Sequence, residues 1–259
     1  RLMEMSSTDS APVLAVTGGA SGIGWATVEA WCRDGGAAVI LDFSREKLDA
    51  ALAGAPTDWS LRGIIVDVTD RAAVDDAFAS IAETEQRLDA LVNCAGNAKP
   101  VPSAEMSDAD WEALLEVHLT GTMRACRAAH SLLKDGGGAI VNISSVAGVA
   151  GMPKRASYNT VKHGLIGLTK SLAVEWAPDG IRVNAIGPGY TWTPFNAALE
   201  EQGLLDPAPI TKRIPLNRWA QPEEIAAGIT FLAGPKASFI TGHTLMVDGG
   251  MTIDGNWYE

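Results

Sequence analysis

The chain has 259 residues, a mass of 27.1 kDa and a formal net charge of −11. This length suits one α/β domain, and a content of 47% hydrophobic and 20% charged residues excludes a disordered chain and a collagen-like repeat. The negative charge disfavours nucleic acid and anionic membrane surfaces as partners, since both attract positive fields. The longest apolar runs are strand-sized, so we expect no membrane span.

The cysteines and the first residues bear on the compartment. Cys32, Cys94 and Cys126 are odd in number and widely spaced, which predicts neither a disulfide framework nor a zinc or other metal site. A reducing cytoplasm is the expected location. The start of the chain lacks the apolar core of a signal peptide. We expect a flexible leader over 1–11 and one catalytic domain over 12–259.

Short β-branched apolar runs alternate with helix-length amphipathic segments. The expected strands are Pro12–Thr17, Ala38–Asp42, Arg62–Val66, Asp89–Asn93, Ala139–Ser144, Arg182–Ile186 and an edge strand Thr244–Val247. The expected helices lie at 22–34, 44–53, 70–87, 108–134, 156–177 and 222–234. Strands that are apolar on both faces are typical of buried parallel sheets. The alternation therefore predicts an α/β fold of the single-domain Rossmann type, with a doubly wound parallel sheet of about seven strands flanked by helices.

The least regular stretch is proline-rich and lies between the last two expected strands, over Pro188–Gln221. It follows the carboxyl end of a strand, where ligands of open α/β sheets bind. We predict a substrate lid at about 190–221. An ordinary surface excursion is the alternative.

A glycine-rich turn joins the first strand to the first helix, with the sequence Thr17-Gly18-Gly19-Ala20-Ser21-Gly22-Ile23-Gly24. Glycines permit a tight turn and close approach of a pyrophosphate, which the free N–H groups and dipole of the helix N-terminus stabilise. A turn of this kind alone is a weak signal. Its glycine spacing also differs from the GxGxxG pattern.

The residue that ends the second strand bears on cofactor choice. A carboxylate at Asp42 accepts hydrogen bonds from both adenosine ribose hydroxyls and repels a 2′-phosphate. Phe43 follows where a phosphate-binding arginine would lie, so the sequence favours NAD over NADP. Arg45 counts against this preference unless it belongs to an exposed helix start. Asp67 and Val68, after the third strand, meet either the adenine edge or only the start of a helix.

A tyrosine and a lysine four residues apart predict the proton-transfer group. Tyr158 and Lys162 lie in an expected helix, so their side chains share one face. A phenol with a pKa of about 10 is a poor base near neutrality. An ammonium about 5 Å away contributes roughly 3 kcal/mol at an effective dielectric of about 20. We expect this charge and the oxidised nicotinamide to outweigh burial and lower the tyrosine pKa, with Ser145 binding the substrate oxygen.

These motifs together resemble the short-chain dehydrogenase/reductase family, in its single-domain branch, from Ala15 to Gly250. The resemblance places Ser145, Tyr158 and Lys162 at catalytic positions and implies a dimer or tetramer. Asn93-Cys94-Ala95-Gly96 is similar to the family's Asn-Asn-Ala-Gly motif. Motifs and resemblance together predict cofactor contacts from Gly18, Ser21, Gly22, Ile23, Gly24, Asp42, Phe43, Asp67, Val68, Asn93, Ala95, Gly96, Tyr158, Lys162, Pro188, Gly189, Thr191 and Thr193.

One catalytic position departs from the family's pattern. Where the family usually has Asn, which helps to hold a water that relays protons, this chain has His118. A neutral imidazole both donates and accepts a hydrogen bond, so His118 either serves the same relay or is a tolerated helix residue.

Substrate contacts are expected from Ser145, Tyr158, Tyr190 and Trp192. The loop cations Lys99, Lys154 and Arg155 favour a carboxylate- or phosphate-bearing substrate, or else are solvated.

The predicted activity is an NAD-dependent oxidoreductase that interconverts a secondary alcohol, polyol or sugar hydroxyl with the ketone by hydride transfer. Its partners would be a small-molecule alcohol or ketone and further copies of the chain, as a homotetramer or homodimer. The enzymatic alternative is an NADPH-dependent reductase of 3-oxoacyl thioesters. The alternative of another class is a nucleotide-binding sensor or scaffold without turnover.

Overall fold

Seven parallel strands form one sheet in the computed structural model, which describes residues 11–134, 136–203 and 205–255. The strands are β1 (Val13–Thr17), β2 (Ala37–Asp42), β3 (Leu61–Ile65), β4 (Ala90–Asn93), β5 (Ala139–Ile143), β6 (Arg182–Pro188) and β7 (Thr244–Val247). Their order is β3-β2-β1-β4-β5-β6-β7, so the chain winds outward in both directions from the β1–β4 pair. The predicted fold class is confirmed, including β7 at an edge.

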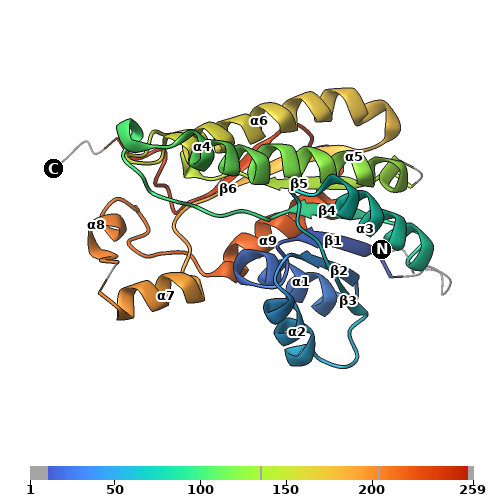
Figure 1. The fold of residues 1–259 in the computed structure, drawn as a ribbon. Coiled ribbons are helices and arrows are strands. Elements are labelled where there is room, and N and C mark those ends of the chain that lie inside the picture. Colours follow the sequence, from blue (N-terminus) through green and yellow to red (C-terminus); the bar gives the residue numbers. More distant parts are fainter. Residues whose placement is uncertain (1–10, 135, 204, 256–259) are drawn as a thin grey trace.

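Helices cover both faces of the sheet (Figure 1). Apolar side chains of α1, α2 and α9 fill the core on one face, and those of α3, α5 and α6 fill it on the other. The α-helices are α1 (Gly22–Arg33), α2 (Arg45–Gly54), α3 (Arg71–Thr84), α4 (Asp108–Leu115), α5 (Gly121–Lys134), α6 (Ala156–Trp176), α7 (Pro194–Glu201), α8 (Ala208–Thr211) and α9 (Pro222–Ala233). Single 3-10 turns lie at Ser103–Glu105, Val146–Gly148, Ala177–Asp179 and Pro235–Ala237. In the part of the chain that is described, none of the helices is long and apolar enough to cross a membrane.

Helix starts follow the polar residues that precede them. The Ser107 hydroxyl accepts a hydrogen bond from the Asp110 N–H at 3.1 Å, and the Asp70 carboxylate accepts from Ala72 and Ala73. Each such cap satisfies a backbone donor that has no partner within its own helix. Asp70, rather than Asp67, is therefore the N-cap of α3.

Two structural expectations need correction. The segment 108–134 is not one regular helix, because a π-turn over Glu116–Thr120 separates α4 from α5. Strand β3 is not buried on both faces; it is half-buried, since it forms an edge of the sheet.

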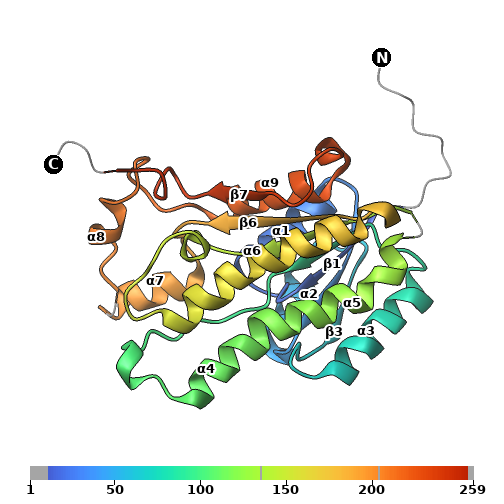
Figure 2. The same cartoon turned by 90° about the horizontal axis from the view of Figure 1, so that it is seen from above.

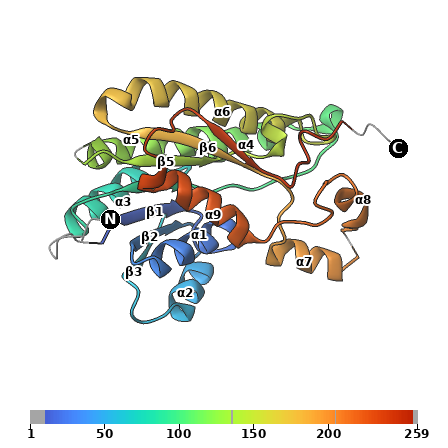
Figure 3. The same cartoon turned by 180° about the vertical axis from the view of Figure 1, so that it is seen from behind.

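The strand register brings the predicted site segments to one edge of the sheet. Thr17 at the end of β1 pairs with Leu41 of β2 and with Asn93 of β4, and Asn93 pairs with Asn142 of β5. The glycine-rich turn and the carboxyl ends of β2, β4 and β5 therefore lie together at one edge of the sheet. Beyond this edge lie α7 and α8, within the predicted lid (Figures 2 and 3). Most of the predicted leader and the last residues, 256–259, lie outside the described residues.

Candidate active site

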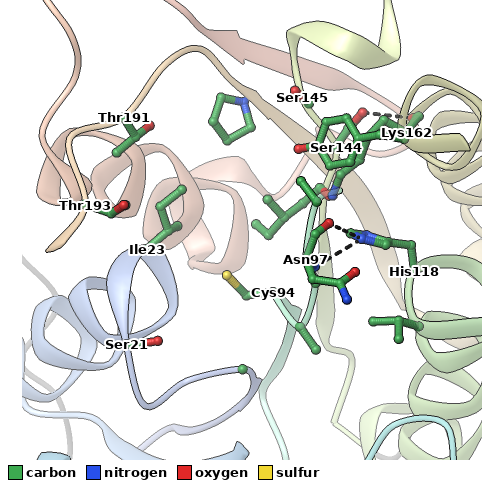
Figure 4. A pocket seen from close by; sticks show the side chains of 18 of the residues that line it. Ser21, Ile23, Cys94, Asn97, His118, Ser144, Ser145, Lys162, Thr191 and Thr193 are labelled. Carbon is green, nitrogen blue, oxygen red and sulfur yellow. Dashed lines mark hydrogen bonds between the residues drawn. The ribbon is translucent and has the colours of Figure 1, made fainter. Parts of the chain in front are cut away.

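A cavity of about 650 Å³ opens at the carboxyl ends of the strands, where open α/β sheets bind ligands. Most of the predicted site residues line it, namely Gly18, Ser21, Ile23, Asp42, Phe43, Asp67, Val68, Ala95, Gly96, His118, Ser145, Tyr158, Lys162, Pro188, Gly189, Tyr190, Thr191 and Thr193. Figure 4 shows how several of these side chains converge. Four predicted residues do not line the cavity: Gly22, Gly24, Asn93 and Trp192.

The glycine-rich turn forms a close-packed cradle beside the cavity. Gly18 has a φ of +65°, and a Cβ atom there would lie 2.8 Å from the Ala95 Cα. A Cβ on Gly24 would overlap the Gly18 carbonyl oxygen, so this glycine lets α1 start against the turn although it does not line the cavity. At Gly18, only glycine allows both the positive φ and the close approach to the Ala95 backbone. The cradle fits the pyrophosphate of a dinucleotide at the start of α1.

Asp42 is a buried acceptor at the carboxyl end of β2. It is 4% exposed. One carboxylate oxygen accepts from the Ala20 N–H at 3.1 Å and the other from the Ser44 N–H at 3.0 Å. These bonds fix the carboxylate and leave lone pairs for ribose hydroxyls. Arg45 is exposed and faces Asp49 at 3.9 Å, so it belongs to the surface of α2.

Several lining residues were missed by sequence reasoning. Lys47, one helical turn into α2, lines the same end as Asp42, and Thr69 and Asn196 also line the cavity. Lys47 had a sequence signal, because it lies in the first turn of the helix that follows Asp42, where the Ser44 hydroxyl accepts from its N–H at 3.3 Å. Thr69 had none, since its position depends on the course of the loop after β3, whereas Asn196 lies in α7, within the predicted lid.

Asn93 links three elements behind the cavity. Its amide donates to the Asn142 side-chain oxygen at 2.9 Å, and the Asn142 amide donates to the Thr169 hydroxyl at 2.9 Å. The chain of bonds joins β4, β5 and α6. Although the Asn93 Oδ1 has no partner among the described residues, the two bonds tie α6 to the sheet.

The segment after β5 and the helix α6 present the predicted proton-transfer group. The Lys162 ammonium lies 5.4 Å from the centre of the Tyr158 ring and donates to the Ile143 carbonyl oxygen at 2.7 Å. The Ser144 hydroxyl donates to the Lys162 carbonyl oxygen at 2.9 Å, which holds α6 to the end of β5. Ser145 accepts a bond from the Ala147 N–H at 3.1 Å. Serine, tyrosine and lysine thus meet at the cavity wall.

Burial dominates the electrostatics of this group. It raises the pKa of Tyr158, although a hydrogen bond from Ser145 and the charge of Arg155 act in the opposite direction. Burial also lowers the pKa of Lys162 to about 8. In the protein without a cofactor, burial therefore outweighs the opposing effects at Tyr158. The expectation that charge wins once oxidised nicotinamide is bound stays a prediction.

His118 lies in the π-turn and is 2% exposed. Its Nε2 lies 2.9 Å from the Asn97 carbonyl oxygen and 3.2 Å from the Asn97 nitrogen (Figure 4). Its Nδ1 is buried and has no partner among the described residues. Burial and the charge of Lys162 lower the pKa of His118 to about 3, so the imidazole is neutral. Its ring meets the Tyr158 ring edge-on at 5.9 Å, and π-turns are frequent at functional sites.

The two ends of the predicted lid, near Thr191 and Ala220, lie side by side. Thr191 forms a bridge with Ala220, and the Trp192 N–H donates to the Ala220 carbonyl oxygen at 2.7 Å. The Tyr190 ring lies 5.1 Å from the Trp219 ring, as does that of Trp192. Tyr190 therefore lines the cavity, whereas Trp192 packs at the base of the lid.

Known proteins share this architecture and sequence. A family model described as enoyl-(acyl carrier protein) reductase matches residues 18–252. A 3-oxoacyl-(acyl-carrier-protein) reductase of Thermotoga maritima is 36% identical over 93% of this chain and 98% of its own length. D-threitol dehydrogenase of Mycolicibacterium smegmatis is 39% identical over 93% of each chain. The solved structure of ElxO with NADP bound has a TM-score of 0.90 at 30% identity, covering 95% of this chain and all of the other.

The family model matches nearly the whole described chain and includes the cradle, α6 and β7. The relatives' names describe dehydrogenases and reductases, in agreement with the chemistry of the site. The chain therefore belongs to the short-chain dehydrogenase/reductase family and is an NAD(P)-dependent oxidoreductase that acts on CH–OH groups.

Proposed function

We propose that the protein is an NAD-dependent dehydrogenase of a secondary alcohol, polyol or sugar, working reversibly. The observation that carries the cofactor preference is the buried Asp42 carboxylate, fixed by two backbone N–H groups at the adenosine end of the cavity. It would accept from both ribose hydroxyls, whereas the 2′-phosphate of NADP would bring negative charge against a buried anion. Lys47 is exposed and offers a phosphate only a screened charge.

The remaining predicted contacts complete the cofactor site. The Gly18 turn would hold the pyrophosphate, and Asp67 and Val68 would meet the adenine edge. Lys162 would hydrogen-bond the nicotinamide ribose, and the segment from Pro188 to Thr193 would hold the carboxamide. A bound nicotinamide supplies the hydride chemistry.

The chain's own residues move the proton. In the oxidation direction, the Tyr158 phenolate oxygen takes the proton of the substrate hydroxyl while the Ser145 hydroxyl holds the substrate oxygen. The Lys162 ammonium stabilises the phenolate and opposes the effect of burial. In reduction, the Tyr158 O–H returns the proton to the oxygen that becomes the alcohol.

His118 would serve the proton relay to solvent. Its Nε2 is engaged by the Asn97 backbone, and its buried Nδ1 has no partner among the described residues. A neutral imidazole with one free nitrogen can donate a hydrogen bond to a relay water or accept one from it. The competing interpretation is that His118 only positions the Asn97 loop.

Two relatives favour different substrates. The similarity to D-threitol dehydrogenase supports a polyol or another secondary alcohol. The similarity to a 3-oxoacyl-(acyl-carrier-protein) reductase supports the alternative, a 3-oxoacyl thioester with NADPH, and the NADP complex of ElxO is a further reason to test both nucleotides.

The deciding experiment screens alcohols, hydroxy acids, sugars and polyols with NAD and NADP, and 3-oxoacyl thioesters with NADH and NADPH. We expect the highest kcat/KM with NAD and a secondary alcohol. A higher value with NADPH and a thioester would overturn the proposal. Nucleotide binding without turnover of any substrate would favour the sensor or scaffold.

The assembly and location belong to the same proposal. The helices α4 and α5 run end to end beside α6 on one face of the sheet (Figure 2), and we propose that these helices form the subunit contacts of a homodimer or homotetramer. Light scattering on the purified chain measures this directly. A cytoplasmic enzyme is expected, and localisation of a tagged chain tests it.

A further inference from the structure

The charged residues that line the cavity are divided between its two ends. Asp42 ends β2 and Asp67 follows β3, at one side of the sheet, and Lys47 lines the cavity beside them. Arg155 and Lys162 belong to α6 and its start, beside β5 and β6. None of the lining residues at this second end is acidic in the described part of the chain. The catalytic end is therefore a positive site within a chain whose net charge is −11.

Arg155 is a cation that the proposed mechanism does not use. Its guanidinium carbon lies 6.0 Å from the centre of the Tyr158 ring, and the side chain is half-buried in the cavity wall. No carboxylate of the described residues pairs with it. Lys99, in contrast, is held by Asp110 at 2.7 Å, and Lys154 is exposed and does not line the cavity.

The turn before α6 fixes the point from which Arg155 enters the cavity. Lys154 has a φ of +61°, which is uncommon for a residue other than glycine. Its carbonyl oxygen accepts from the Val101 N–H at 3.0 Å, and the Arg155 carbonyl oxygen accepts from the Asn159 N–H at 2.7 Å. These bonds join the turn to the facing loop and to the first turn of α6. The backbone is therefore held on both sides of Arg155, and from this point the guanidinium reaches the space beside the Tyr158 ring.

A second residue at this end responds to the same charge. Tyr190, at the base of the lid, lines the cavity. Burial raises the pKa of Tyr190, and the charges of Arg155 and Arg213 act in the opposite direction. Arg155 is thus within electrostatic reach of both Tyr158 and Tyr190, and the space that it faces is the substrate end of the cavity.

We propose that Arg155 binds a carboxylate of the substrate, so that the natural substrates are secondary hydroxy acids and the corresponding keto acids. One planar guanidinium matches one carboxylate through two parallel hydrogen bonds. Its place beside Tyr158 puts the carboxylate on the same small molecule as the reacting hydroxyl. This inference rests on the proposed function for the chemistry and adds the substrate class.

The test uses matched acids and amides that differ only in charge. The probes are 2-, 3- and 4-hydroxypentanoate and their three amides, titrated by calorimetry into the protein saturated with its preferred reduced nicotinamide nucleotide. Alcohol and reduced nucleotide do not react with each other, so the titration measures binding alone. The variants are Arg155→Gln, Arg155→Lys and the control Lys99→Gln, whose amine already has a carboxylate partner.

We expect at least one acid to bind the wild type about 10- to 100-fold more tightly than its amide, the range for a hydrogen bond to a charged group. Arg155→Gln should abolish that preference, Arg155→Lys should keep part of it, and Lys99→Gln should keep all of it. Equal binding of acid and amide, absence of binding by all six probes, or a preference that survives Arg155→Gln would overturn the inference. If Arg155→Gln fails to bind the nucleotide, Arg155→Lys takes its place in the test. We expect Arg155→Lys to prefer the acid less strongly than the wild type does, and an undiminished preference would overturn the inference.

Turnover separates this inference from the proposed function. Oxidation of acids and amides by NAD with equal kcat/KM would leave the dehydrogenase proposal standing and overturn the carboxylate site. If acids bind more tightly than amides but no substrate reduces NAD, the carboxylate site would stand and the dehydrogenase proposal would be overturned. If Arg155 acts only on the Tyr158 phenol, its replacement changes kcat for acids and amides alike, which also contradicts the inference.

Discussion

Lys162 places its ammonium nitrogen 5.4 Å from the centre of the Tyr158 ring, one turn further along α6. Lys162 is buried and Tyr158 is half-buried in the cavity wall, and burial shifts their pKa values in opposite directions. It raises the pKa of Tyr158 and lowers that of Lys162 to about 8. By Coulomb attraction we expect the lysine charge to favour the phenolate, and this charge is lost as the pH rises past the lysine pKa of about 8. The mechanism depends on the balance between these effects.

Replacing Lys162 with Met should slow oxidation and move its rising pH limb to higher pH. At 5.4 Å and an effective dielectric of about 20, the lost interaction is about 3 kcal/mol, or roughly 100-fold in rate at neutral pH. The measurement is the pH profile of kcat/KM for oxidation. An unchanged profile would show that Lys162 does not act on the phenol.

The same residue should make stability depend on pH. Lys162 has a pKa of about 8 in the folded chain against an ordinary value of 10.5. Between these values the folded state binds fewer protons than the unfolded state, so stability rises with pH, by about 3 kcal/mol in all. Below about pH 8 the full cost of the buried charge is present. Lys162→Met lacks this dependence, and urea unfolding of both proteins below pH 8 and near pH 10.5 measures the difference. Parallel pH dependences of the two proteins would contradict this account.

Asp42→Asn should weaken the preference for NAD. The substitution keeps the side-chain shape but removes the charge that repels a 2′-phosphate, so the ratio of kcat/KM for NAD to that for NADP should fall by about 10-fold or more. Asp49→Asn is the matched control, because this carboxylate lies on the exposed face of α2 beside Arg45. Equal ratios in Asp42→Asn and wild type would remove Asp42 as the determinant.

His118→Ala should lower kcat by about 10-fold while the dissociation constant for the nucleotide changes little, if His118 serves the proton relay. His118→Asn should recover most of the rate, since an amide also donates and accepts. With a pKa of about 3, His118 itself contributes no limb to the profile between pH 5 and 9. Unchanged turnover and pH profile in His118→Ala would discard the relay.

Patterns that depend on local chemistry were readable in the sequence. Thr244–Val247 is a strand with the predicted bounds, because a β-branched apolar run beside a turn has few other solutions. Asp42 ends its strand at the cavity, since the carboxyl ends of parallel strands share an edge. The helix expected from residue 108 starts there, after the Ser107 cap.

Features that depend on packing between distant segments were not readable. The π-turn at Glu116–Thr120 contains no proline or glycine that would mark it in the sequence. Gly96 has to be glycine because a Cβ there would lie 2.5 Å from the His118 ring, a contact between separate elements. The rise in the Tyr158 pKa depends on how far α6 sinks into the wall, which no spacing of residues specifies.

The removal of one oxygen atom tests the central claim most directly. Tyr158→Phe keeps the ring that lies against His118 and Lys162 but deletes the group that exchanges the proton. The measurement is single-turnover oxidation of the best substrate at saturating nucleotide, together with the nucleotide dissociation constant. The account predicts a loss of about 100- to 10,000-fold in rate with nucleotide binding retained. Oxidation at an undiminished rate would contradict it.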